Sequence, residues 1–428
     1  MNKKKFLATK LDISNKLIND DVLFVIKELQ KNGYDGYIVG GGIRDLILKK
    51  KPKDFDIVTN ATPEIIKKIF KRNSIIIGRR FKIVHVYFQK PNFEKLVNNR
   101  PIMEKHIIEV STYRSNNKKN YVNEHGRIMI DNNYGKQKDD AIRRDFTINS
   151  IYYDPIKEVI IDYHNGLKDL ENKTIKMIGD PNTRYIEDPV RILRALRLAI
   201  KLDLNIDKAT LEPIKKLKHL LKNENIGRRY EEMLKILLSG TSSLCIKKLK
   251  ELPLPKNIFP LFDEIYFKKN IDLIANEVLN KTDNRINLEE SNVSVSFLLA
   301  SILWHLIYPN WQHRINKGDD MYEALEIAIE MQKNHILNYG VMRNIFTAIT
   351  SIWKTQITFE NPNLEHLNNF VSSSRFRQGL HLFNLRHFAK EVDPKLYEWW
   401  NQYAEATKDE EKIQLQKKLT KICNIKIK

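Results

Sequence analysis

Cysteine is nearly absent from this sequence, since only Cys245 and Cys423 occur among 428 residues. Two cysteines so far apart exclude a disulfide scaffold and a cysteine-based zinc site, and they favour a reducing compartment. Long apolar runs are absent too, because serines and a histidine interrupt the longest apolar stretch, Val293–Tyr308. A membrane span needs roughly 20 apolar residues. We therefore expect no membrane as a partner.

An export signal is also missing from the sequence as it stands. The segment 1–20 contains several lysines but no apolar core of the kind that a secretory signal has. Together with the low cysteine content, this favours the cytoplasm.

What the sequence does have is positive charge. Lys and Arg number 73 against 53 Asp and Glu, which gives a formal net charge of +20 at pH 7. A protein this basic attracts polyanions, and nucleic acid is the leading candidate. The alternative is compositional, because the chain is rich in lysine, isoleucine and asparagine.

Up to about Tyr153 the chain alternates predicted helices with short β-branched strands. Helices are expected at Asp21–Gln30, Ile43–Lys49 and Pro63–Lys71. Strands are expected at Tyr37–Val39, Phe55–Thr59, Ser74–Ile77, Phe81–Phe88 and His106–Tyr113. The polar segment Arg114–Lys138 predicts a mobile loop. Further strands are expected at Val159–Tyr163 and Thr174–Ile178, with the turn sequence Asn165-Gly166 between them.

From Glu187 onward the apolar residues recur with a period of 3.6, which is typical of helices. The expected helices are Val190–Leu202, Lys208–Leu221, Gly227–Leu238, Phe297–Tyr308, Met321–Lys333 and Val341–Trp353. The pattern predicts an α+β fold in which a mixed head precedes a long all-helical body, with the boundary near Gly179–Tyr185.

Asp54 and Asp56 flank Phe55 in a predicted strand, so alternation places both carboxylates on one face. Two carboxylates this close repel each other unless a cation lies between them. Oxygen-only coordination suits Mg²⁺ that arrives with a nucleotide phosphate. The alternative is an ordinary solvated strand end, because the Asp-x-Asp pattern is common.

A glycine turn formed by Gly40, Gly41 and Gly42 joins a predicted strand to a predicted helix. Without side chains the backbone can approach a phosphate, and free N–H groups at a helix start favour an anion. Arg44 in the first turn can add a charge-assisted contact. Alone, the segment could be a plain tight turn. Because the glycine segment lies shortly before Asp54 and Asp56 in the sequence, the two motifs together predict a nucleoside-triphosphate site.

A third motif is Arg143-Arg144-Asp145. The basic pair suits triphosphate charge, and Asp145 is a candidate third carboxylate for the metal site. Glu109 on the strand His106–Tyr113 competes with Asp145 for this role. The alternative is a surface cluster of ion pairs.

The fourth motif contains Glu187, Asp188 and Arg191, which we expect on one helix face, with Glu187 holding Arg191. A carboxylate accepts from an exocyclic amino group, while a guanidinium donates to a bare ring nitrogen. Adenine and cytosine present that pair, whereas guanine and uracil present the reverse and would leave both groups unpaired. The pair Asp188 and Arg191 would thus select ATP and CTP. The alternative is a charged helix face.

The order of these motifs resembles the class II nucleotidyltransferase superfamily of bacterial poly(A) polymerases and tRNA CCA-adding enzymes. The resemblance begins near Asp21, spans nearly the whole chain, and rests on the segments GGGIRD, KDFDIVTNATPE, RRDFTINSIYYD, GDPNTRYIEDPVRILRALRLA and IGRRYEEMLKIL. The segments IGRRFKIVHV, YEALEIAIEMQK and RFRQGLHLFNLRHFAKE are similar to the poly(A) polymerase branch. No His-Asp dipeptide occurs, so the phosphohydrolase domain of some CCA-adding relatives is not expected.

The resemblance implies a nucleotidyltransferase head at 1–180, a helical neck that binds the nucleotide base and RNA at 181–240, and a helical body and tail at 241–428. It implies that Asp54 and Asp56 bind the metal, that Asp145 is the third catalytic aspartate, and that further residues bind ATP. The implied ATP-binding residues are Gly40, Gly41, Gly42, Arg44, Arg143, Arg144, Asp188, Arg191 and Arg194.

The implied activity is the template-independent transfer of AMP from ATP to RNA 3′ ends, with Mg²⁺ as cofactor and a two-metal mechanism. RNA phosphates are expected to contact Lys215–Lys222, Arg375 and Arg377, although solvated helix faces explain these residues equally well. The RNA-decay machinery is a further partner that the resemblance alone implies. CCA addition to tRNA is the nearest alternative activity, and a non-catalytic RNA-binding subunit is an alternative of another class.

Overall fold

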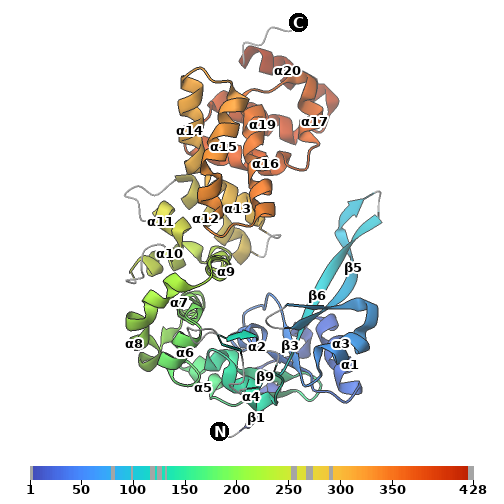
Figure 1. Ribbon diagram of the computed structural model, residues 1–428. Helices are drawn as coiled ribbons and strands as arrows, with labels where there is room; N and C mark the ends of the chain where they lie inside the picture. The colour runs from blue at the N-terminus through green and yellow to red at the C-terminus, as the bar shows by residue number, and fades with distance from the viewer. Residues whose placement is uncertain are drawn as a thin grey trace. The chain divides into compact units, whose positions relative to one another are not determined.

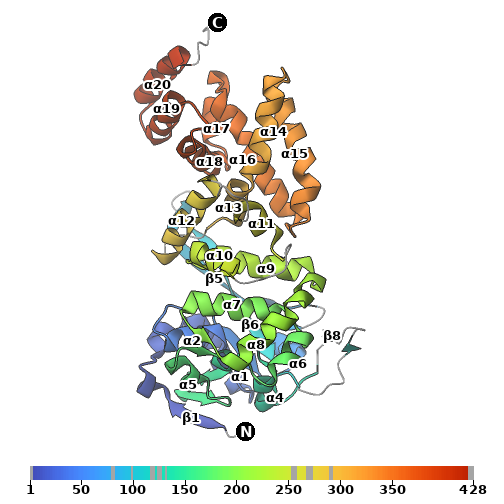
Figure 2. The same ribbon diagram turned by 90° about the vertical axis from the view of Figure 1, so that its left-hand side faces the viewer.

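The computed structural model describes residues 3–78, 82–97, 100–115, 121–122, 128–130, 133–251, 258–266, 273–288 and 293–422 (Figures 1 and 2). The chain divides into two compact units, Met1–Leu220 and Leu221–Lys428. The first unit contains a mixed β-sheet with helices and the second is helical, which confirms the α+β fold.

An eight-stranded sheet organises the first unit, in the order β1-β10-β9-β2-β3-β6-β5-β4. Its strands are β1 (Lys4–Leu7), β2 (Tyr37–Val39), β3 (Asp56–Thr59), β4 (Ser74–Ile77), β5 (Ile83–Val97), β6 (Arg100–Thr112), β9 (Ile151–Asp154) and β10 (Val159–Asp162). Strands β3 and β6 run parallel, and the other neighbouring strands run antiparallel. In Figure 1, β5 and β6 extend as a long hairpin beyond the neighbouring strands.

Helices and short strands complete this unit. The helices are α1 (Asp20–Lys31), α2 (Gly41–Ile47), α3 (Pro63–Phe70), α4 (Gln137–Arg143), α5 (Gly166–Glu171), α6 (Pro181–Glu187), α7 (Val190–Leu202) and α8 (Lys208–Leu217). The short strands are β7 (Tyr121–Val122), β8 (Ile128–Ile130), β11 (Thr174–Ile175) and β12 (Asn205–Ile206).

Local sequence explains where the helix that follows the sheet begins. The side chain of Asp180 accepts a hydrogen bond from the backbone N–H of Thr183 at 2.9 Å, and Pro181 occupies the first helical position of α6. Both features are typical of helix starts. Pro189 then separates α6 from α7, since the residue before a proline disfavours helical dihedral angles.

The second unit consists of helices α9 (Ile226–Leu237), α10 (Ser242–Glu251), α11 (Pro260–Tyr266), α12 (Leu273–Asn287), α13 (Val295–Ile302), α14 (Trp304–Asn316), α15 (Met321–Leu337), α16 (Arg343–Glu360), α17 (Leu367–Val371), α18 (Phe376–Phe388), α19 (Pro394–Glu405) and α20 (Asp409–Ile422). Helices α14 and α15 pack against each other, as do α12, α13 and α18 (Figure 2). Within the described ranges, no helix is long and apolar enough to cross a bilayer.

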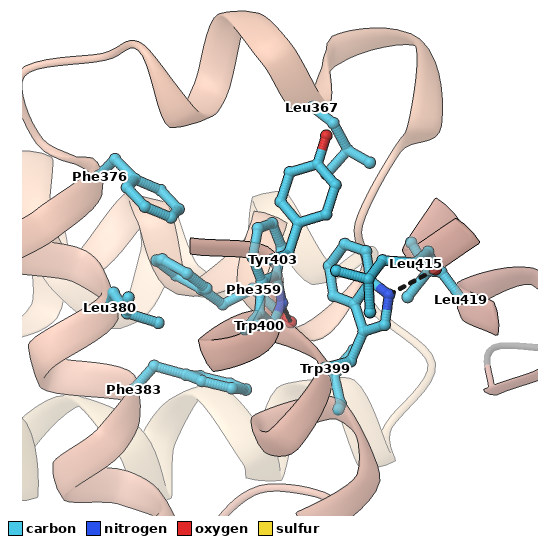
Figure 3. Close-up of a cluster of buried hydrophobic side chains, with 11 residues drawn as sticks. Phe359, Leu367, Phe376, Leu380, Phe383, Trp399, Trp400, Tyr403, Leu415 and Leu419 are labelled. Atoms are coloured by element: carbon cyan, nitrogen blue, oxygen red, sulfur yellow. Dashed lines mark hydrogen bonds between the residues drawn. The ribbon is translucent and has the colours of Figure 1, made fainter. Parts of the chain in front are cut away.

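An aromatic cluster forms much of the core near the carboxyl end of this unit (Figure 3). Phe359 lies at its centre, with its ring centroid 4.8 Å from that of Trp400 and 5.2 Å from that of Phe383. The indole N–H of Trp400 donates to the Phe359 carbonyl at 2.9 Å, and that of Trp399 donates to the Leu415 carbonyl at 2.7 Å. Buried indoles need such partners, so the cluster fixes α16, α18, α19 and α20 together.

Strands Tyr37–Val39 and Ser74–Ile77 and helix Val190–Leu202 have the predicted bounds. Other predicted elements are confirmed with shifted ends. The predicted mobile loop at Arg114–Lys138 falls partly outside the described residues, as does the start of the predicted strand Phe81–Phe88. Within the described part of that loop, β7 pairs with β8, Arg114 forms a bridge with Tyr134, and α4 begins at Gln137.

The predicted turn sequence Asn165-Gly166 leads directly into a helix: Asn165 has a left-handed backbone conformation, Gly166 is the first residue of α5, and β11 pairs with β12. The Asp162 carboxylate accepts hydrogen bonds from the N–H groups of His164 and Leu167, at 2.9 and 3.0 Å, and so fixes a helical start. A Cβ at Gly166 would lie 2.3 Å from the Thr147 carbonyl oxygen, so this glycine lets α5 approach the chain closely.

The predicted helix Phe297–Tyr308 is broken at Leu303, which ends α13 and precedes α14. The imidazole Nδ1 of His305 lies 2.8 Å from the Ile302 carbonyl oxygen, and the N–H of Leu306 bonds to the Leu303 carbonyl in a tighter turn. The His305 imidazole therefore takes the place of the Leu306 N–H as the partner of the Ile302 carbonyl.

Candidate active site

The segment that contains Asp54 packs directly on the glycine segment at residues 40–42. A Cβ at Gly42 would lie 2.8 Å from the ring of Phe55 and 2.9 Å from the Asp54 carbonyl oxygen, so no other residue fits here without a shift. Gly40 has a φ of +78°, in the region that favours glycine. A Cβ at this position would lie 3.7 Å from Oδ2 of Asp56. The glycine segment and the aspartate segment are thus immediate neighbours.

Two details of these segments differ from the prediction. The strand begins at Asp56, so Asp54 precedes it and strand alternation does not place Asp54. Only Gly40 forms the turn, because α2 already begins at Gly41 and the N–H of Arg44 bonds to the Gly40 carbonyl.

Glu109 is brought beside Asp56 by the sheet. Strands β3 and β6 pair in parallel with Ile57 opposite Val110, so the residues that precede them are also neighbours. Nε2 of His85, on β5, lies 3.3 Å from Oε1 of Glu109. The fold therefore groups Glu109 with the two predicted metal ligands.

The electrostatics of Asp56 reflect this crowding. Its side chain still reaches solvent, yet desolvation by the surrounding protein, together with the negative charges of Asp54 and Glu109, raises the pKa of Asp56 to about 6. The positive charges of Arg144 and Arg194 act in the opposite direction. An excess of negative charge at neighbouring oxygen ligands is what a hard divalent cation relieves.

Asp145 has the opposite environment. Burial opposes its charge, but Arg194 at 2.7 Å, the Asn149 side chain at 3.1 Å and the N–H of Phe146 at 2.8 Å outweigh burial and lower the pKa of Asp145 to about 2. The carboxylate of Asp145 is thus compensated by protein groups. Of the two candidates for a third carboxylate, Glu109 is the one that acts on Asp56 electrostatically.

Arginines gather next to this carboxylate. Arg143 donates to the Ser115 carbonyl at 2.8 Å, and burial, with the nearby charges of Arg114, Arg184 and Arg191, lowers the pKa of Arg143 to about 10. Such mutual destabilisation of like charges marks a region of strong positive potential. This region suits a polyanion such as a triphosphate.

Arg144 is fixed by Asp140 and Tyr152. Burial opposes its charge, but the Asp140 carboxylate at 3.0 Å and the Tyr152 hydroxyl raise the pKa of Arg144 above its usual value. Its Nη1 lies near Gly40, because a Cβ there would be 3.9 Å away. Arg144 is therefore held in a fixed position, close to Gly40 and within electrostatic reach of Asp56.

Arg184, which sequence reasoning missed, links α6 to this region. Its Nη2 donates to the carbonyls of Arg143 at 2.6 Å and Arg144 at 2.8 Å, while its Nη1 donates to Glu187 at 2.8 Å. The residue lies within the family-like segment GDPNTRYIEDPVR, but only the folded chain shows which carbonyls it reaches.

The predicted contact between Glu187 and Arg191 is present, with Arg191 Nη1 3.3 Å from Glu187 Oε2 and 2.7 Å from the Arg184 carbonyl oxygen. Asp188 does not share the helix with Arg191, because Pro189 ends α6 there. The carbonyl of Asp188 still accepts from the N–H of Arg191 at 3.1 Å, so the two residues remain in one turn.

Arg44 is buried behind the glycine turn. It donates to Asp45 at 2.6 and 2.8 Å and to Oδ1 of Asn149 at 2.7 Å. Asn149 in turn donates to Asp145. This network connects α2 with the Asp145 segment, and its role in holding phosphate stays a prediction.

Across the part of the chain that the structure describes, no set of three or more acidic, histidine or cysteine side chains is arranged as a metal site. The carboxylates of Asp54, Asp56 and Glu109 nevertheless fit a divalent cation by their chemistry, since all are oxygen ligands and their charges raise the pKa of Asp56.

Sequence comparison gives the context for this geometry. Three families match the chain: the poly(A) polymerase head domain at residues 36–176, the "Probable RNA and SrmB- binding site of polymerase A" at 203–266, and the polymerase A arginine-rich C-terminus at 317–422. Poly(A) polymerase I of Salmonella typhi is 35% identical over 415 residues, which are 94% of this chain and 85% of the relative. This chain belongs to the poly(A) polymerase I family. It is therefore a nucleotidyltransferase.

A second poly(A) polymerase I agrees with this assignment, and CCA-adding enzymes are also similar to the chain. Poly(A) polymerase I of Haemophilus influenzae is 34% identical over 98% of this chain and 92% of the relative. The CCA-adding enzyme of Enterococcus faecalis is 36% identical, but over only 50% of this chain and 48% of that enzyme. A solved CCA-adding enzyme has a TM-score of 0.51 at 19% identity over 98% of this chain and all of that structure, which shows the common fold alone.

Proposed function

We propose that the chain transfers AMP from ATP to the 3′-hydroxyl of RNA without a template and so builds poly(A) tails. The observation that supports this most directly is the juxtaposition of Asp54 and Asp56 with the glycine turn at Gly40, in a chain that belongs to the poly(A) polymerase I family. One side of the site is rich in carboxylates, and the other is rich in arginines. This separation of charge suits a metal-bound nucleoside triphosphate.

In this proposal Asp54 and Asp56 hold Mg²⁺, with Glu109 as the third carboxylate that the sheet brings to them. Bound divalent ions lower the pKa of the attacking hydroxyl and neutralise the charge of the leaving pyrophosphate. Arg143 and Arg144, held by Ser115, Asp140 and Tyr152, stabilise the triphosphate charge from fixed positions. Because these arginines are already oriented, little reorganisation is needed when ATP binds.

The base of ATP contacts Asp188 and Arg191 in this proposal. Glu187 and the Arg184 carbonyl orient the Arg191 guanidinium. A guanidinium and a carboxylate in one turn suit the ring nitrogen and amino group of adenine. RNA phosphates contact basic residues outside the catalytic centre, with Lys215–Lys222, Arg375 and Arg377 as candidates.

The decisive experiment is incorporation of labelled AMP into oligo(A) by the purified full chain with Mg²⁺. We expect long homopolymeric products with the wild type. The same assay with Mg²⁺ withheld, or with a Glu109→Gln variant, tests the metal assignment. Absence of any incorporation by the wild type under these conditions would contradict the proposed function.

CCA addition to tRNA remains the rival activity, because half of the chain is also similar to CCA-adding enzymes and adenine and cytosine present the same hydrogen-bonding pattern. The enzyme is incubated with oligo(A) and with a tRNA that lacks its CCA end, and the products are sequenced. Incorporated C followed by termination after the completed CCA end would favour the rival. A long run of A on either substrate supports poly(A) addition.

We also propose that this reaction serves RNA turnover in the cytoplasm, in company with the RNA-decay machinery. The family and the low cysteine content support this proposal. Copurification of a decay nuclease with the tagged full chain, compared in nuclease-treated and untreated extracts, tests it.

A further inference from the structure

The helical unit contains a pocket of about 480 Å³ that the proposed reaction does not use. It lies between α12, α13 and α18, which pack against one another. Its polar lining includes Lys281, Arg285, Ser294, Gln378 and His381. The part contributed by α12 and α13 falls between the residues that match the RNA-binding family and those that match the arginine-rich family.

The pocket is electropositive. Burial and the positive charges of Arg285, Lys281 and Arg377 lower the pKa of His381. Lys281 pairs with Glu277 at 3.2 Å, which balances part of this charge. The Asp283 carboxylate is turned to Ser242, whose N–H and hydroxyl both donate to it at 2.9 Å. Asp283 on α12 therefore binds Ser242 and does not line the pocket. With Lys281, Arg285 and Arg377 nearby, we expect the pocket to attract anions.

An aromatic side chain lies beside these charges. Phe297 lines the pocket and contacts His381 edge to face, with the ring centroids 6.1 Å apart. Gln378 is held by Ser294 at 3.1 Å and by Arg375 at 2.8 Å, so the amide wall of the pocket has a fixed orientation. Basic groups, an aromatic ring and amides around one cavity match the three parts of a nucleotide: phosphate, base face and base edge.

We propose that this pocket binds one nucleotide of single-stranded RNA, with its phosphate at Lys281 and Arg285 and its base against Phe297 and His381. The volume lies within the usual range of about 300–1,000 Å³ for small-molecule sites. The choice of RNA over a free nucleotide rests on the proposed function, in which the chain must hold a growing RNA strand. A nucleotide uses all three features at once, since its flat base stacks on an aromatic ring while its phosphate meets the basic groups.

The test measures binding of a labelled oligo(A) to the full chain. In the Lys281→Ala/Arg285→Ala variant we expect weaker binding and a salt dependence that falls by about 0.7 in log–log slope for each lost phosphate contact. Both side chains are exposed on α12, so the fold should persist. Lys395→Ala on α19 is the matched control, because this exposed lysine does not line the pocket.

A second variant tests whether an RNA base stacks on Phe297. Phe297→Leu keeps an apolar side chain but removes the ring, and we expect affinity for oligo(A) to fall roughly 5- to 150-fold, the equivalent of about 1–3 kcal/mol per stacked base. In AMP transfer, the KM for RNA should rise by the same factor while kcat at saturating RNA stays unchanged. A structural defect would lower kcat and the melting temperature as well.

Unchanged RNA affinity in both variants would overturn the pocket assignment. A loss of ATP affinity without a loss of RNA affinity would overturn it too, because the occupant would then be a free nucleotide. These outcomes are distinct from failure of the proposed function, which shows itself as a wild type that binds oligo(A) but incorporates no AMP.

Discussion

Two acidic regions of the first unit contain the same residue type in opposite electrostatic states. Around Asp56, desolvation and the charges of Asp54 and Glu109 raise the pKa to about 6. Around Asp145, Arg194 and hydrogen bonds outweigh burial and lower the pKa to about 2. In the first region the charges of Arg144 and Arg194 only partly offset the neighbouring carboxylates, whereas in the second region Arg194 pairs directly with Asp145 at 2.7 Å. The difference shows that the charge of Asp145 is compensated by protein groups, whereas the charge of Asp56 is not; the metal-binding and catalytic roles of these aspartates stay predictions.

The largest effect should follow from removing a carboxylate of the first region. We expect Asp54→Ala and Asp56→Asn to lower AMP incorporation on the order of a thousandfold or more, since loss of metal binding removes several kcal/mol of transition-state stabilisation. The circular dichroism spectrum should be retained, and the melting temperature should not fall. Substantial incorporation by either purified variant would show that these aspartates do not bind the metal.

Removing the carboxylate of the second region should lower the stability of the fold. Asp145→Asn is expected to lower the free energy of unfolding by roughly 2–3 kcal/mol at pH 7, because it leaves Arg194 without its carboxylate. Because the folded pKa lies below the usual value, this contribution is complete above about pH 4 and is lost as the pH falls toward 2. Urea unfolding at several pH values measures it.

Asp203→Asn is the matched control for this measurement. Asp203 forms an exposed pair with Lys173 at 3.8 Å and has a left-handed backbone conformation that asparagine tolerates. Equal stability losses in the two variants at pH 7 would contradict the contrast between the regions.

A smaller effect is expected on base choice. Arg191→Ala should reduce the preference for ATP over GTP by about 5- to 150-fold, the equivalent of about 1–3 kcal/mol for one buried polar contact. Competition between the two labelled nucleotides measures the ratio of kcat/KM values. Arg197→Ala, on the same helix, is the control. Retained discrimination would show that Arg191 does not read the base and serves only its contacts with Glu187 and the Arg184 carbonyl.

The smallest effect concerns the protein without metal. Asp54→Asn should raise the melting temperature in EDTA, by an amount that corresponds to less than about 1 kcal/mol, because it removes one repulsive charge from a solvated group. The folded pKa of Asp56 is raised, so its ionisation destabilises the fold as pH rises through 6. The gain should therefore be present above pH 6 and fade at lower pH. A loss of stability at pH 8 would be inconsistent with repulsion.

Sequence periodicity predicted much of the fold because burial on one face determines local structure. Helix Val190–Leu202 and strand Tyr37–Val39 have the expected bounds for this reason. The residues Asn165-Gly166 were expected as a turn, and in the structure they also start helix α5, because Asp162 accepts from nearby N–H groups. Local sequence does not distinguish these outcomes.

The candidate site shows a similar limit. The motifs identified Asp54, Asp56 and Asp145, since each lies in a short distinctive segment. The approach of Glu109 to Asp56 depends on parallel pairing between β3 and β6, which are distant in sequence. Pro189 separates Asp188 from the helix of Arg191, an effect that spacing alone concealed. Long-range pairing and backbone breaks therefore had to come from the folded chain.

The two hydrogen bonds from Arg184 to the carbonyls of Arg143 and Arg144 have a mechanical consequence. One guanidinium joins α6, which precedes the proposed base contacts, to Arg143 and Arg144, the proposed phosphate contacts, so a shift of one segment is transmitted to the other. A mismatched base that tilts α6 would also displace the cations that face the triphosphate. Nucleotide selectivity and the rate of AMP transfer would then depend on the same contact, so a wrong nucleotide would lower kcat as well as raise KM.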